Sequence, residues 1–364
     1  MELEARPYQD RVVEKVIGYF EAGDEDALIE SPTGSGKTIM GLRVAKYFEE
    51  TRGWKTNWVA MRRNLLRQVE EANRRFFNCA RLTTVSMFAK TPPRADLTIV
   101  DEAQHDATAS CVHIHAQSGS RAILGLSATP FRTDKLKISF RRVVRDAGIH
   151  RLIHDGYLSP YHHWVIDKWT PERVAHTWLR ERERWGKSIV FFRTIAECNE
   201  FARRVNQGAH RCEVVTAKTH RERQLAAFKR GDFQVVANVG VLCEGFDCPT
   251  LRTVFVRDSG KLPTIQMAGR AFRRAKDKLF CNVVQSAKSR HPFTKTARPE
   301  CAHVRRDDRW LTLGNSDKAI ECAREMVTIL AKAQTQLPDF LMNQPPSHHF
   351  IPAFENDIAL AADG

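Results

Sequence analysis

Apolar runs and amphipathic stretches alternate along the first half of the chain. The runs Leu97-Thr98-Ile99-Val100 and Ala122-Ile123-Leu124-Gly125-Leu126 do not alternate with polar residues, which is typical of strands buried on both faces of a sheet. Strands and helices in turn are the pattern of a parallel sheet with helical crossovers. We predict strands at 27–30, 57–61, 97–100 and 122–126, and helices at 38–50 and 64–77.

A second alternating block begins near residue 161. The join before it, near 148–160, contains Asp155-Gly156-Tyr157-Leu158-Ser159-Pro160. We therefore predict a first domain at 1–155 and a second domain at 156–289. In the second block we predict strands at 188–192, 213–216, 234–238, 253–256 and 279–284, and helices at 172–185, 195–206, 221–229 and 264–274.

The alternation ends after Ser289, and residues 290–364 form a third segment. We predict that 290–314 is basic and irregular, that 317–333 is a helix, and that the proline-containing tail from 334 is partly flexible. Ser316 would cap this helix. The expected fold class is α/β, with two parallel-sheet domains in tandem and a short C-terminal helical extension.

The composition changes this picture little. The chain has 364 residues, of which 42% are hydrophobic and 27% are charged, as in water-soluble globular proteins. It has no run of about 18 apolar residues, and it begins Met1-Glu2-Leu3-Glu4, unlike a signal peptide. The nine cysteines include no C-x-x-C pair, which favours reduced thiols. We expect a cytoplasmic protein without a membrane partner.

The charge of the chain indicates a class of partner. The formal net charge is +14 at pH 7, and residues 261–309 contain 13 Lys and Arg against 4 Asp and Glu. A basic excess of this size favours polyanionic partners, and nucleic acid is the usual one.

The segment Ser31-Pro32-Thr33-Gly34-Ser35-Gly36-Lys37-Thr38 follows a predicted strand and opens a predicted helix. This is the context of a phosphate-binding loop, in which glycines let backbone N–H groups converge on a phosphate. Lys37 would reach the β- and γ-phosphate oxygens, and the Thr38 hydroxyl would bind Mg²⁺. The strict pattern has glycine at the first position, where this chain has Ser31.

An acidic pair, Asp101-Glu102, ends the apolar strand predicted at 97–100. A carboxylate at the carboxyl end of a parallel strand beside a phosphate loop can hold Mg²⁺ through water. Asp101 is in that position, and Glu102 is then placed to orient and deprotonate the attacking water.

These motifs resemble those of a known family. Asp101-Glu102-Ala103-Gln104 and Ser127-Ala128-Thr129-Pro130 look like motifs of the DEAD/DEAH-box side of superfamily 2 helicases. Other segments follow in the order of that family, ending with Gln266-Met267-Ala268-Gly269-Arg270-Ala271-Phe272-Arg273, which has the pattern Q-x-x-G-R-x-x-R. The others are Arg6-Pro7-Tyr8-Gln9, 59–68 and Thr83-Thr84-Val85, which precede Asp101, and 189–194 and 241–249, which follow Pro130. Residues 128–132 and 155–160 look most like RadD-like and phage-encoded helicases.

The resemblance covers residues 6 to about 285 and implies two RecA-like domains, ATP and Mg²⁺ as cofactors, and nucleic acid as partner. DNA, single-stranded or branched, is favoured over RNA, and we expect a monomer. The implied catalytic residues are Lys37, Asp101, Glu102, Gln266, Arg270 and Arg273, and the implied metal ligands are Thr38 and Asp101. The implied nucleotide contacts are Arg6, Gln9, Thr33, Gly34, Ser35, Gly36, Lys37, Thr38, Gly245 and Asp247. The implied nucleic-acid contacts are Arg62, Thr84, Arg193 and Thr216, with Ser127 and Thr129 coupling hydrolysis to domain movement.

Three alternatives stay open. A translocase or branch-migration motor on duplex DNA would move without separating strands, and the sequence does not exclude it. An ATP-gated nucleic-acid clamp would need neither Glu102 nor the paired arginines, whose guanidinium groups are suited to neutralise charge on a γ-phosphate. A kinase or GTPase with a phosphate loop usually has one such domain rather than two. One departure from the family is Gln104, where His or Asp is frequent, so coupling through a histidine is in doubt.

Overall fold

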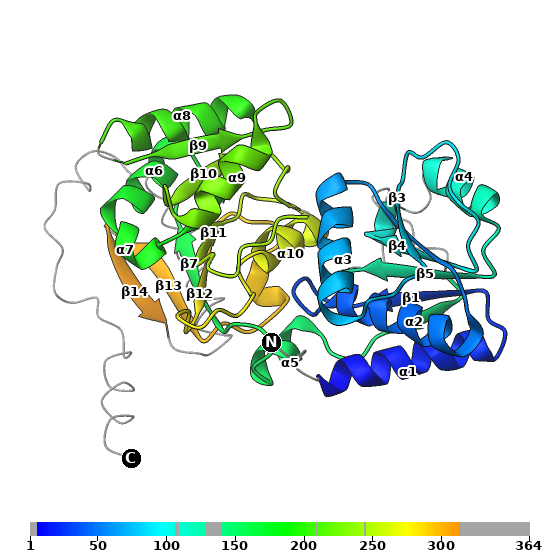
Figure 1. Cartoon of the computed structure of the whole chain (residues 1–364). Coiled ribbons are helices and arrows are strands. Elements are labelled where there is room, and N and C mark those ends of the chain that lie inside the picture. Colours follow the sequence, from blue (N-terminus) through cyan, green and yellow to red (C-terminus); the bar gives the residue numbers. More distant parts are fainter. Residues whose placement is uncertain are drawn as a thin grey trace, which may run out of the picture.

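The computed structural model describes residues 6–105, 109–128, 140–208, 210–243, 245–306 and 308–313. Within these residues the chain forms two sheets, each covered by helices (Figure 1). The predicted class, two RecA-like α/β domains in tandem, is confirmed. The helix predicted at 317–333 and the tail after it lie outside the described residues.

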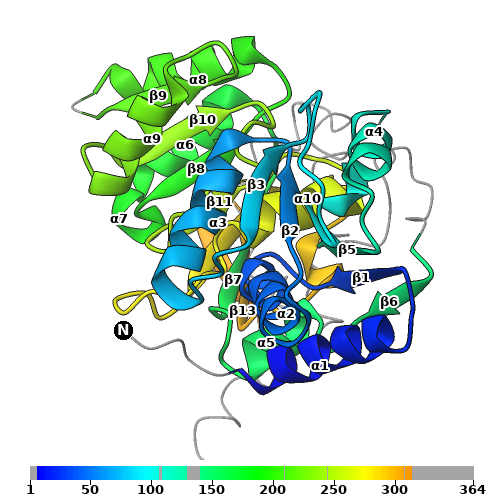
Figure 2. The same ribbon diagram turned by 45° about the vertical axis from the view of Figure 1, so that its right-hand side comes forward.

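The first domain is built on a parallel sheet of six strands in the order β3-β2-β4-β5-β1-β6. Helices α1, α2 and α3 pack on one face with Ala27 and Ile29, and α4 packs on the other face with Leu28 (Figure 2). The strands are β1 (Asp26–Glu30), β2 (Thr56–Ala60), β3 (Leu82–Ser86), β4 (Leu97–Asp101), β5 (Ala122–Ser127) and β6 (Arg142–Val144). The helices are α1 (Pro7–Glu21), α2 (Lys37–Arg52), α3 (Arg63–Phe76), the 3-10 helix η1 (Ala103–His105) and α4 (Ala109–Ser118).

The second domain is built on an eight-stranded sheet in the order β14-β13-β7-β12-β11-β8-β10-β9, in which the β13–β14 pair is antiparallel. Helices α6 and α8 pack on one face, and α5, α9 and α10 pack on the other. The strands are β7 (Tyr161–Ile166), β8 (Ser188–Phe191), β9 (Cys212–Val215), β10 (Val235–Asn238), β11 (Thr253–Phe255), β12 (Cys281–Ser286), β13 (Cys301–Arg306) and β14 (Arg309–Leu313). The helices are α5 (Ile149–His154), α6 (Pro171–Arg180), α7 (Arg182–Trp185), α8 (Ile195–Asn206), α9 (Arg221–Arg230), α10 (Lys261–Gly269) and the 3-10 helix η2 (Phe293–Lys295).

Residues 290–313 correct one prediction. They are not irregular, because β13 pairs with β7 and extends the second sheet, and β14 pairs with β13. The charged residue Arg305 interrupts the apolar pattern by which a buried strand is predicted. Arg305 is nevertheless only 4% exposed, and its guanidinium donates to Thr177 Oγ1 at 2.8 Å and to Asp308 Oδ1 at 3.1 Å. A charged residue that is satisfied by neighbours can occupy a buried strand position.

Other element boundaries also differ from the predictions. The helix predicted at 172–185 is two helices, because Glu181 leaves helical geometry with φ −139° and ψ 43°. The helix predicted at 264–274 ends at Gly269, so Arg273 lies in the loop after it. The strand predicted at 279–284 is shifted to Cys281–Ser286. Helix α1 and strands β3, β6 and β7 are additions to the predicted set.

The two domains contact each other near the phosphate loop. Tyr8, in the first turn of α1, packs in the apolar core of the second domain. Conversely, a Cβ on Gly34 would lie 3.1 Å from Leu158 Cδ2, in the segment that leads into β7. The two domains are therefore in contact next to the carboxyl end of β1.

Candidate ATP site between the domains

The phosphate loop, residues 31–38, connects β1 to α2. Gly34 and Gly36 have φ values of 87° and 86°, in the left-handed region that glycine occupies without a steric cost. Gly36 also has no room for a side chain, since a Cβ there would lie 2.4 Å from Gln9 Nε2. The unusual Ser31 is accommodated by a hydrogen bond of 2.7 Å from its Oγ to Ser35 Oγ. The loop ends at the N-terminus of α2, where the helix dipole favours a bound phosphate.

The start of α1 fixes the back of this loop. Tyr8 Oη and Gln9 Nε2 both donate to the carbonyl oxygen of Ser35, at 2.5 and 2.8 Å. Gln9 is 4% exposed. The structure therefore places Gln9 against the phosphate loop, and its contact with the nucleotide stays a prediction.

The acidic pair lies at the carboxyl edge of the same sheet. Asp101 ends β4 level with Leu126 of β5, and Glu30 of β1 is level with Ser127. Glu102 has a φ of 54°, and its backbone N–H donates to Asp101 Oδ1 at 3.0 Å. Consecutive residues of an extended strand point to opposite faces of the sheet, and the left-handed geometry at Glu102 ends this alternation directly after β4.

Gln104 connects Glu102 to the next motif. Its Nε2 donates to Glu102 Oε2 at 2.8 Å, and its Oε1 accepts a hydrogen bond of 2.8 Å from Ser127 Oγ. Gln104 and Ser127 are both buried, and the carbonyl of Ser127 accepts from the backbone N–H of Ser31 in the phosphate loop. The acidic pair, Ser127 and the loop thus form one hydrogen-bonded unit. Thr129, predicted to act with Ser127, lies outside the described residues.

The residues predicted to hold Mg²⁺ fit that ion chemically. Thr38 offers a hydroxyl and Asp101 a carboxylate, and both are the hard oxygen donors that Mg²⁺ prefers. The described residues contain no group of three or more His, Cys, Asp or Glu side chains suited to a metal. A site of one carboxylate and one hydroxyl is the kind that Mg²⁺ completes with water and nucleotide phosphates.

The second domain brings its arginines to this loop. A Cβ on Gly269, the last residue of α10, would lie 2.9 Å from Thr33 Cβ. Gln266 lies one turn earlier and is 9% exposed. Arg270 Nη1 donates to the carbonyl of Phe246 at 3.2 Å.

Arg273 is the second of these arginines. Its guanidinium forms an ion pair with Asp247, and burial lowers its pKa to about 10. Its Cγ would lie 3.5 Å from a Cβ on Gly34 of the phosphate loop. Arg273 thus lies over the phosphate loop.

The ammonium group of Lys37 interacts with charged side chains of both domains. Its Nζ donates to the carbonyls of Ser31 at 3.0 Å and Pro32 at 3.3 Å. Its pKa is lowered, first by burial and further by Arg270 and Arg273, while the carboxylates of Glu102 and Asp101 oppose the shift. Two carboxylates from the first domain and two guanidinium groups from the second therefore act on one ammonium group.

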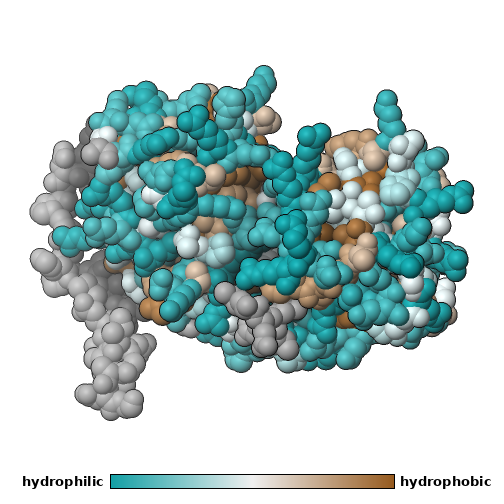
Figure 3. All heavy atoms as spheres, in the orientation of Figure 1, coloured by the Kyte–Doolittle hydropathy of each residue, from teal (hydrophilic) through white to brown (hydrophobic). Residues whose placement is uncertain are grey.

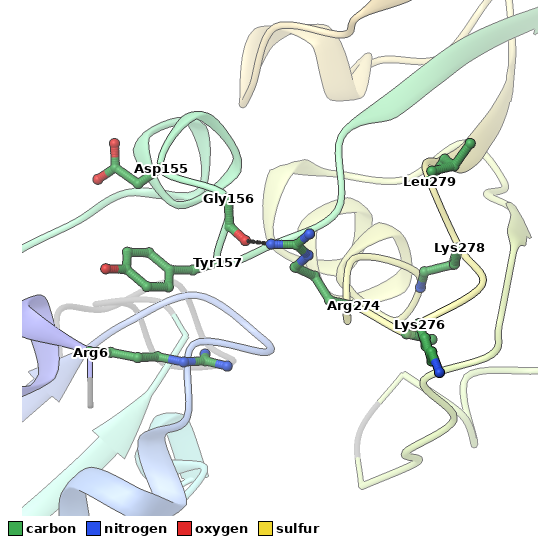
Figure 4. Close-up of a pocket in the computed structure, with 9 residues that line it drawn as sticks. Arg6, Asp155, Gly156, Tyr157, Arg274, Lys276, Lys278 and Leu279 are labelled. Atoms are coloured by element: carbon green, nitrogen blue, oxygen red, sulfur yellow. Dashed lines mark hydrogen bonds between the residues drawn. The ribbon is translucent and has the colours of Figure 1, made fainter. Parts of the chain in front are cut away.

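A pocket opens beside the loop, at the join of the domains (Figure 4). Arg6 and Tyr157 lie on one side, with the Arg6 guanidinium 5.7 Å from the centre of the Tyr157 ring. Arg274, Lys276 and Lys278 lie on the other side. Arg6 also donates to Tyr8 Oη, which in turn contacts the phosphate loop. The pocket is thus connected to the loop through Tyr8.

The residues predicted to contact nucleic acid lie in strands or directly after them, in both domains. Thr84 is in β3, where its Oγ1 donates to Glu70 at 2.5 Å, and Thr216 follows β9, where its Oγ1 accepts from Lys218 N at 3.2 Å. Arg193 follows β8 and pairs with Asp258 at 2.9 Å. These three predictions stay untested.

Arg62 lies at an interdomain contact instead of on an open surface. It caps the start of α3, and its Nη1 donates to the carbonyl of Val241 in the second domain at 2.8 Å. Asn64 Nδ2 donates to the carbonyl of Gly245 at 2.8 Å beside it. Gly245 has a φ of 70° and is close-packed, since a Cβ there would lie 3.1 Å from Asn64 Nδ2. Gly245, predicted as a nucleotide contact, therefore touches α3.

Sequence reasoning missed Lys278, which was counted only as part of a basic segment. Its Nζ donates to the carbonyls of Pro249 at 2.9 Å, Leu251 at 3.2 Å and Ala271 at 2.8 Å. Ala271 lies between Arg270 and Arg273, so Lys278 ties the arginine segment to the loop that carries Asp247. Lys278 is therefore a cation of the 261–309 segment whose donors are used inside the protein.

Two family models match the chain one after the other. The model described as "Type III restriction enzyme, res subunit" matches residues 2–91, which include the phosphate loop. The model described as "Helicase conserved C-terminal domain" matches residues 170–275, which include Arg270 and Arg273. The chain belongs to the superfamily 2 helicases. This class of ATPases is built on the two-domain core described above.

The chain is similar to curated and to solved proteins. It is 23% identical over 372 residues to a putative mitochondrial ATP-dependent helicase, irc3, of Schizosaccharomyces pombe, covering 84% of this chain and 61% of the relative. It matches the structure of the Type ISP restriction-modification enzyme LlaBIII bound to DNA, with 16% identity, 80% of this chain, 28% of that chain and a TM-score of 0.58. It also matches Saccharomyces cerevisiae Dbp5 bound to RNA and ADP BeF3, with 15% identity, 90% of this chain, 98% of that chain and a TM-score of 0.57.

The low sequence identities and partial coverage limit what these similarities show. At such identities the solved structures show a shared fold alone. The chain spans between 41% and 61% of the length of these curated relatives. In the part of the chain that the structure describes, no helix has the length and apolar content that a bilayer crossing requires.

Proposed function

We propose that this helicase hydrolyses ATP between its two domains and uses the hydrolysis to move along DNA or to unwind it. The observation that carries the proposal is the approach of the second domain to the phosphate loop, where Gly269 leaves less than 3 Å between a Cβ and Thr33. This approach brings Arg270 and Arg273 into electrostatic range of Lys37. A site that needs both domains gives hydrolysis a direct link to domain movement.

The proposed roles follow from charge and position. Lys37 and the backbone N–H groups of the phosphate loop bind the phosphates, and Thr38 with Asp101 holds Mg²⁺, which neutralises phosphate charge when bound. Glu102 accepts a proton from the attacking water as the new bond to the γ-phosphorus forms and the bond to the bridging oxygen of ADP breaks. Arg270 and Arg273 neutralise the charge that gathers on the transferred group.

The environment of Arg273 supports a closing step. Its present partner is the carboxylate of Asp247. An anionic γ-phosphate would compete with that carboxylate for the same guanidinium group. We propose that this exchange couples nucleotide binding to the 240–249 loop, which contacts α3 through Gly245.

The proposed nucleic-acid path runs across both domains at strand ends away from the phosphate loop. Strands β3 and β9 lie in the upper part of Figure 1, whereas β1 and α2 lie lower in the first domain, and Figure 2 agrees. Contacts to phosphates would come from Thr84, Arg193 and Thr216, and from Arg62 once its contact with Val241 opens. A monomer suffices for this mechanism, since one chain supplies both halves of the site.

The proposed substrate is single-stranded or branched DNA. The net charge of +14 supports a polyanion, and the likeness of 155–160 to RadD-like and phage-encoded helicases favours DNA. The matched structures do not separate the polymers, because one holds DNA and another RNA. A cytoplasmic location stays a prediction.

The test is the ATPase rate with Mg²⁺ and a panel of single-stranded DNA, duplex, forked DNA and RNA at two salt concentrations. We expect stimulation by single-stranded or forked DNA that weakens at higher salt. Arg270→Ala should keep ATP binding and lose the stimulated rate, whereas Arg203→Ala, on an exposed face of α8, should not. Absence of stimulation by any polymer would remove the motor function. ATP-dependent DNA binding without turnover would favour the clamp, and triplex displacement without strand displacement the duplex translocase.

A further inference from the structure

Phe88 stands apart among the large apolar side chains of the described residues. Five of these are exposed, and Phe88, at 64% exposure, is the one aromatic ring among them. Leaving a phenyl ring in water forgoes burial that is worth about 1.5–3 kcal/mol for a side chain of this size. Its neighbour Met87 is 1% exposed and packs in the core between the sheet and α4. The chain thus buries one residue and turns the next outward.

The turn that carries Phe88 is fixed on both sides. The backbone N–H of Met87 donates to the carbonyl of Ala60 at 3.0 Å, and that of Ala89 donates to the carbonyl of Ser86 at 2.9 Å. The carbonyl of Lys90 accepts a hydrogen bond of 2.8 Å from His113 Nε2 of α4. These hydrogen bonds hold the turn in the conformation that exposes Phe88.

The position of Phe88 follows from the strand register. Ala60 of β2 is paired with Ser86 of β3, and both strands run in the same direction. Arg62 and Phe88 each follow two residues after this last pair, so both lie in the segments that leave the carboxyl edge of the sheet. Figure 3 shows apolar atoms at the surface of the upper part of the first domain, where β3 and α4 lie in Figure 1.

The segment that carries this ring is basic. Residues 82–95 contain Lys90 and Arg94 and no Asp or Glu. Both cations are exposed, and so is Arg63 at the start of α3. An aromatic face among cations is the arrangement that binds single-stranded nucleic acid without sequence preference, because every base has a π-face and every nucleotide a phosphate.

We propose that Phe88 is a stacking platform for one unpaired base of a strand bound across the ends of β2 and β3. This inference rests on the proposed function and adds to it the form of the substrate: a strand whose bases are unstacked at this point. The phosphates on either side of that base lie against the cations of the two strand ends. Duplex DNA, whose bases are stacked on each other, has no free base face to offer.

The test measures binding of a single-stranded oligonucleotide with one 2-aminopurine, and of a blunt duplex, by wild type, Phe88→Ala, Phe88→Trp and Phe88→Leu. We expect Phe88→Ala to weaken single-strand binding about 5- to 150-fold, the range for loss of one stacked base. The 2-aminopurine quench should disappear in Phe88→Ala, return in Phe88→Trp and stay low in Phe88→Leu. Duplex binding and ATPase without nucleic acid should be unchanged.

Leu311→Ala is the matched control, since it removes another exposed apolar side chain, 47% exposed, from β14. It should bind like the wild type. Equal quenching by wild type and Phe88→Ala, or equal loss of single-strand and duplex binding, would overturn the stacking role and leave the motor function standing. If wild type shows neither binding nor ATPase stimulation by single strands, the proposed function fails and the stacking role with it.

Discussion

Gln104 donates a hydrogen bond of 2.8 Å from its side-chain amide to the carboxylate of Glu102. The same amide accepts from Ser127 Oγ at 2.8 Å, so one neutral side chain connects Glu102 to Ser127. The orientation of the proposed general base therefore depends on a residue that neither binds nucleotide nor changes charge.

Replacing Gln104 with Leu should lower the catalytic rate and leave the KM for ATP nearly unchanged. The change removes two buried hydrogen bonds, each worth about 0.5–1.5 kcal/mol, so we expect a fall in kcat of roughly ten- to a hundredfold. Steady-state ATPase assays with saturating DNA check this. Gln207→Leu, at the exposed end of α8, is the control. A kcat equal to that of the wild type would show that Glu102 is oriented by other groups.

Gly269→Ala should separate the domains at the ATP site. The added methyl group would lie 2.9 Å from Thr33 Cβ, and overpacking of this kind typically costs about 1–3 kcal/mol. We expect the stimulated ATPase rate to fall about 5- to 150-fold while ATP binding by the first domain persists. Gly260→Ala is the control, because it lies at the start of the same helix with nothing within 4 Å of its Cβ. Similar rates for both variants would argue against a tight approach at Thr33.

Lys278 should make stability depend on pH above neutrality. Burial lowers its pKa to about 8, below its ordinary value of 10.5. The folded protein therefore loses this proton at a lower pH than the unfolded chain, and the unfolded chain holds more protons between pH 8 and 10.5. Because the unfolded chain binds more protons at Lys278, raising the pH from 8 to 10.5 stabilises the folded state.

The free energy of unfolding of wild type relative to Lys278→Met should accordingly rise between pH 7.5 and 9.5, by on the order of 1–2 kcal/mol. Urea unfolding at both pH values measures it. Lys276→Met, at an exposed position two residues earlier, should show no such change. A pH-independent difference for Lys278→Met would mean that its ammonium is more hydrated than its three carbonyl partners suggest.

Asn64→Ala should weaken the contact between α3 and the 240–249 loop. It removes the hydrogen bond of 2.8 Å to the carbonyl of Gly245, worth about 0.5–1.5 kcal/mol. Arg62, next to α3, belongs to the proposed nucleic-acid path, and the 240–249 loop belongs to the proposed coupling step. We therefore expect the DNA concentration for half-maximal ATPase stimulation to change about two- to tenfold. Glu71→Ala, on the exposed side of the same helix, is the control. No change in Asn64→Ala would make this contact dispensable for coupling.

Much of the fold could be predicted because parallel strands buried on both faces and the phosphate loop leave strong local patterns. The strands at 97–101 and 122–127 and the loop at 31–38 are of this kind. Strand β13 could not be found in this way, because Arg305 is satisfied by residues distant in sequence, Thr177 among them. A charged residue in a strand appears polar until its partners are known.

The candidate site shows the same division. The order of motifs predicts that Lys37, Asp101, Glu102, Arg270 and Arg273 share one site. The structure brings Gly269 of the second domain against Thr33 of the phosphate loop, and the roles of these five residues stay predictions. The contact of Arg62 with Val241 and the three carbonyls held by Lys278 depend on how two domains meet. Neither has a local signal, since each partner is a backbone group without a residue-specific pattern.

The β13–β14 hairpin has a consequence for shortened versions of the chain. β13 covers the outer hydrogen-bonding edge of β7, and the ring of His303 stacks on Trp164 at 3.7 Å between centroids. A truncation after residue 289, where the predicted alternation of strands and helices ends, would expose the edge of β7 and the indole ring of Trp164. Bare strand edges with apolar side chains recruit other molecules, so such a fragment would aggregate even though every catalytic motif is intact.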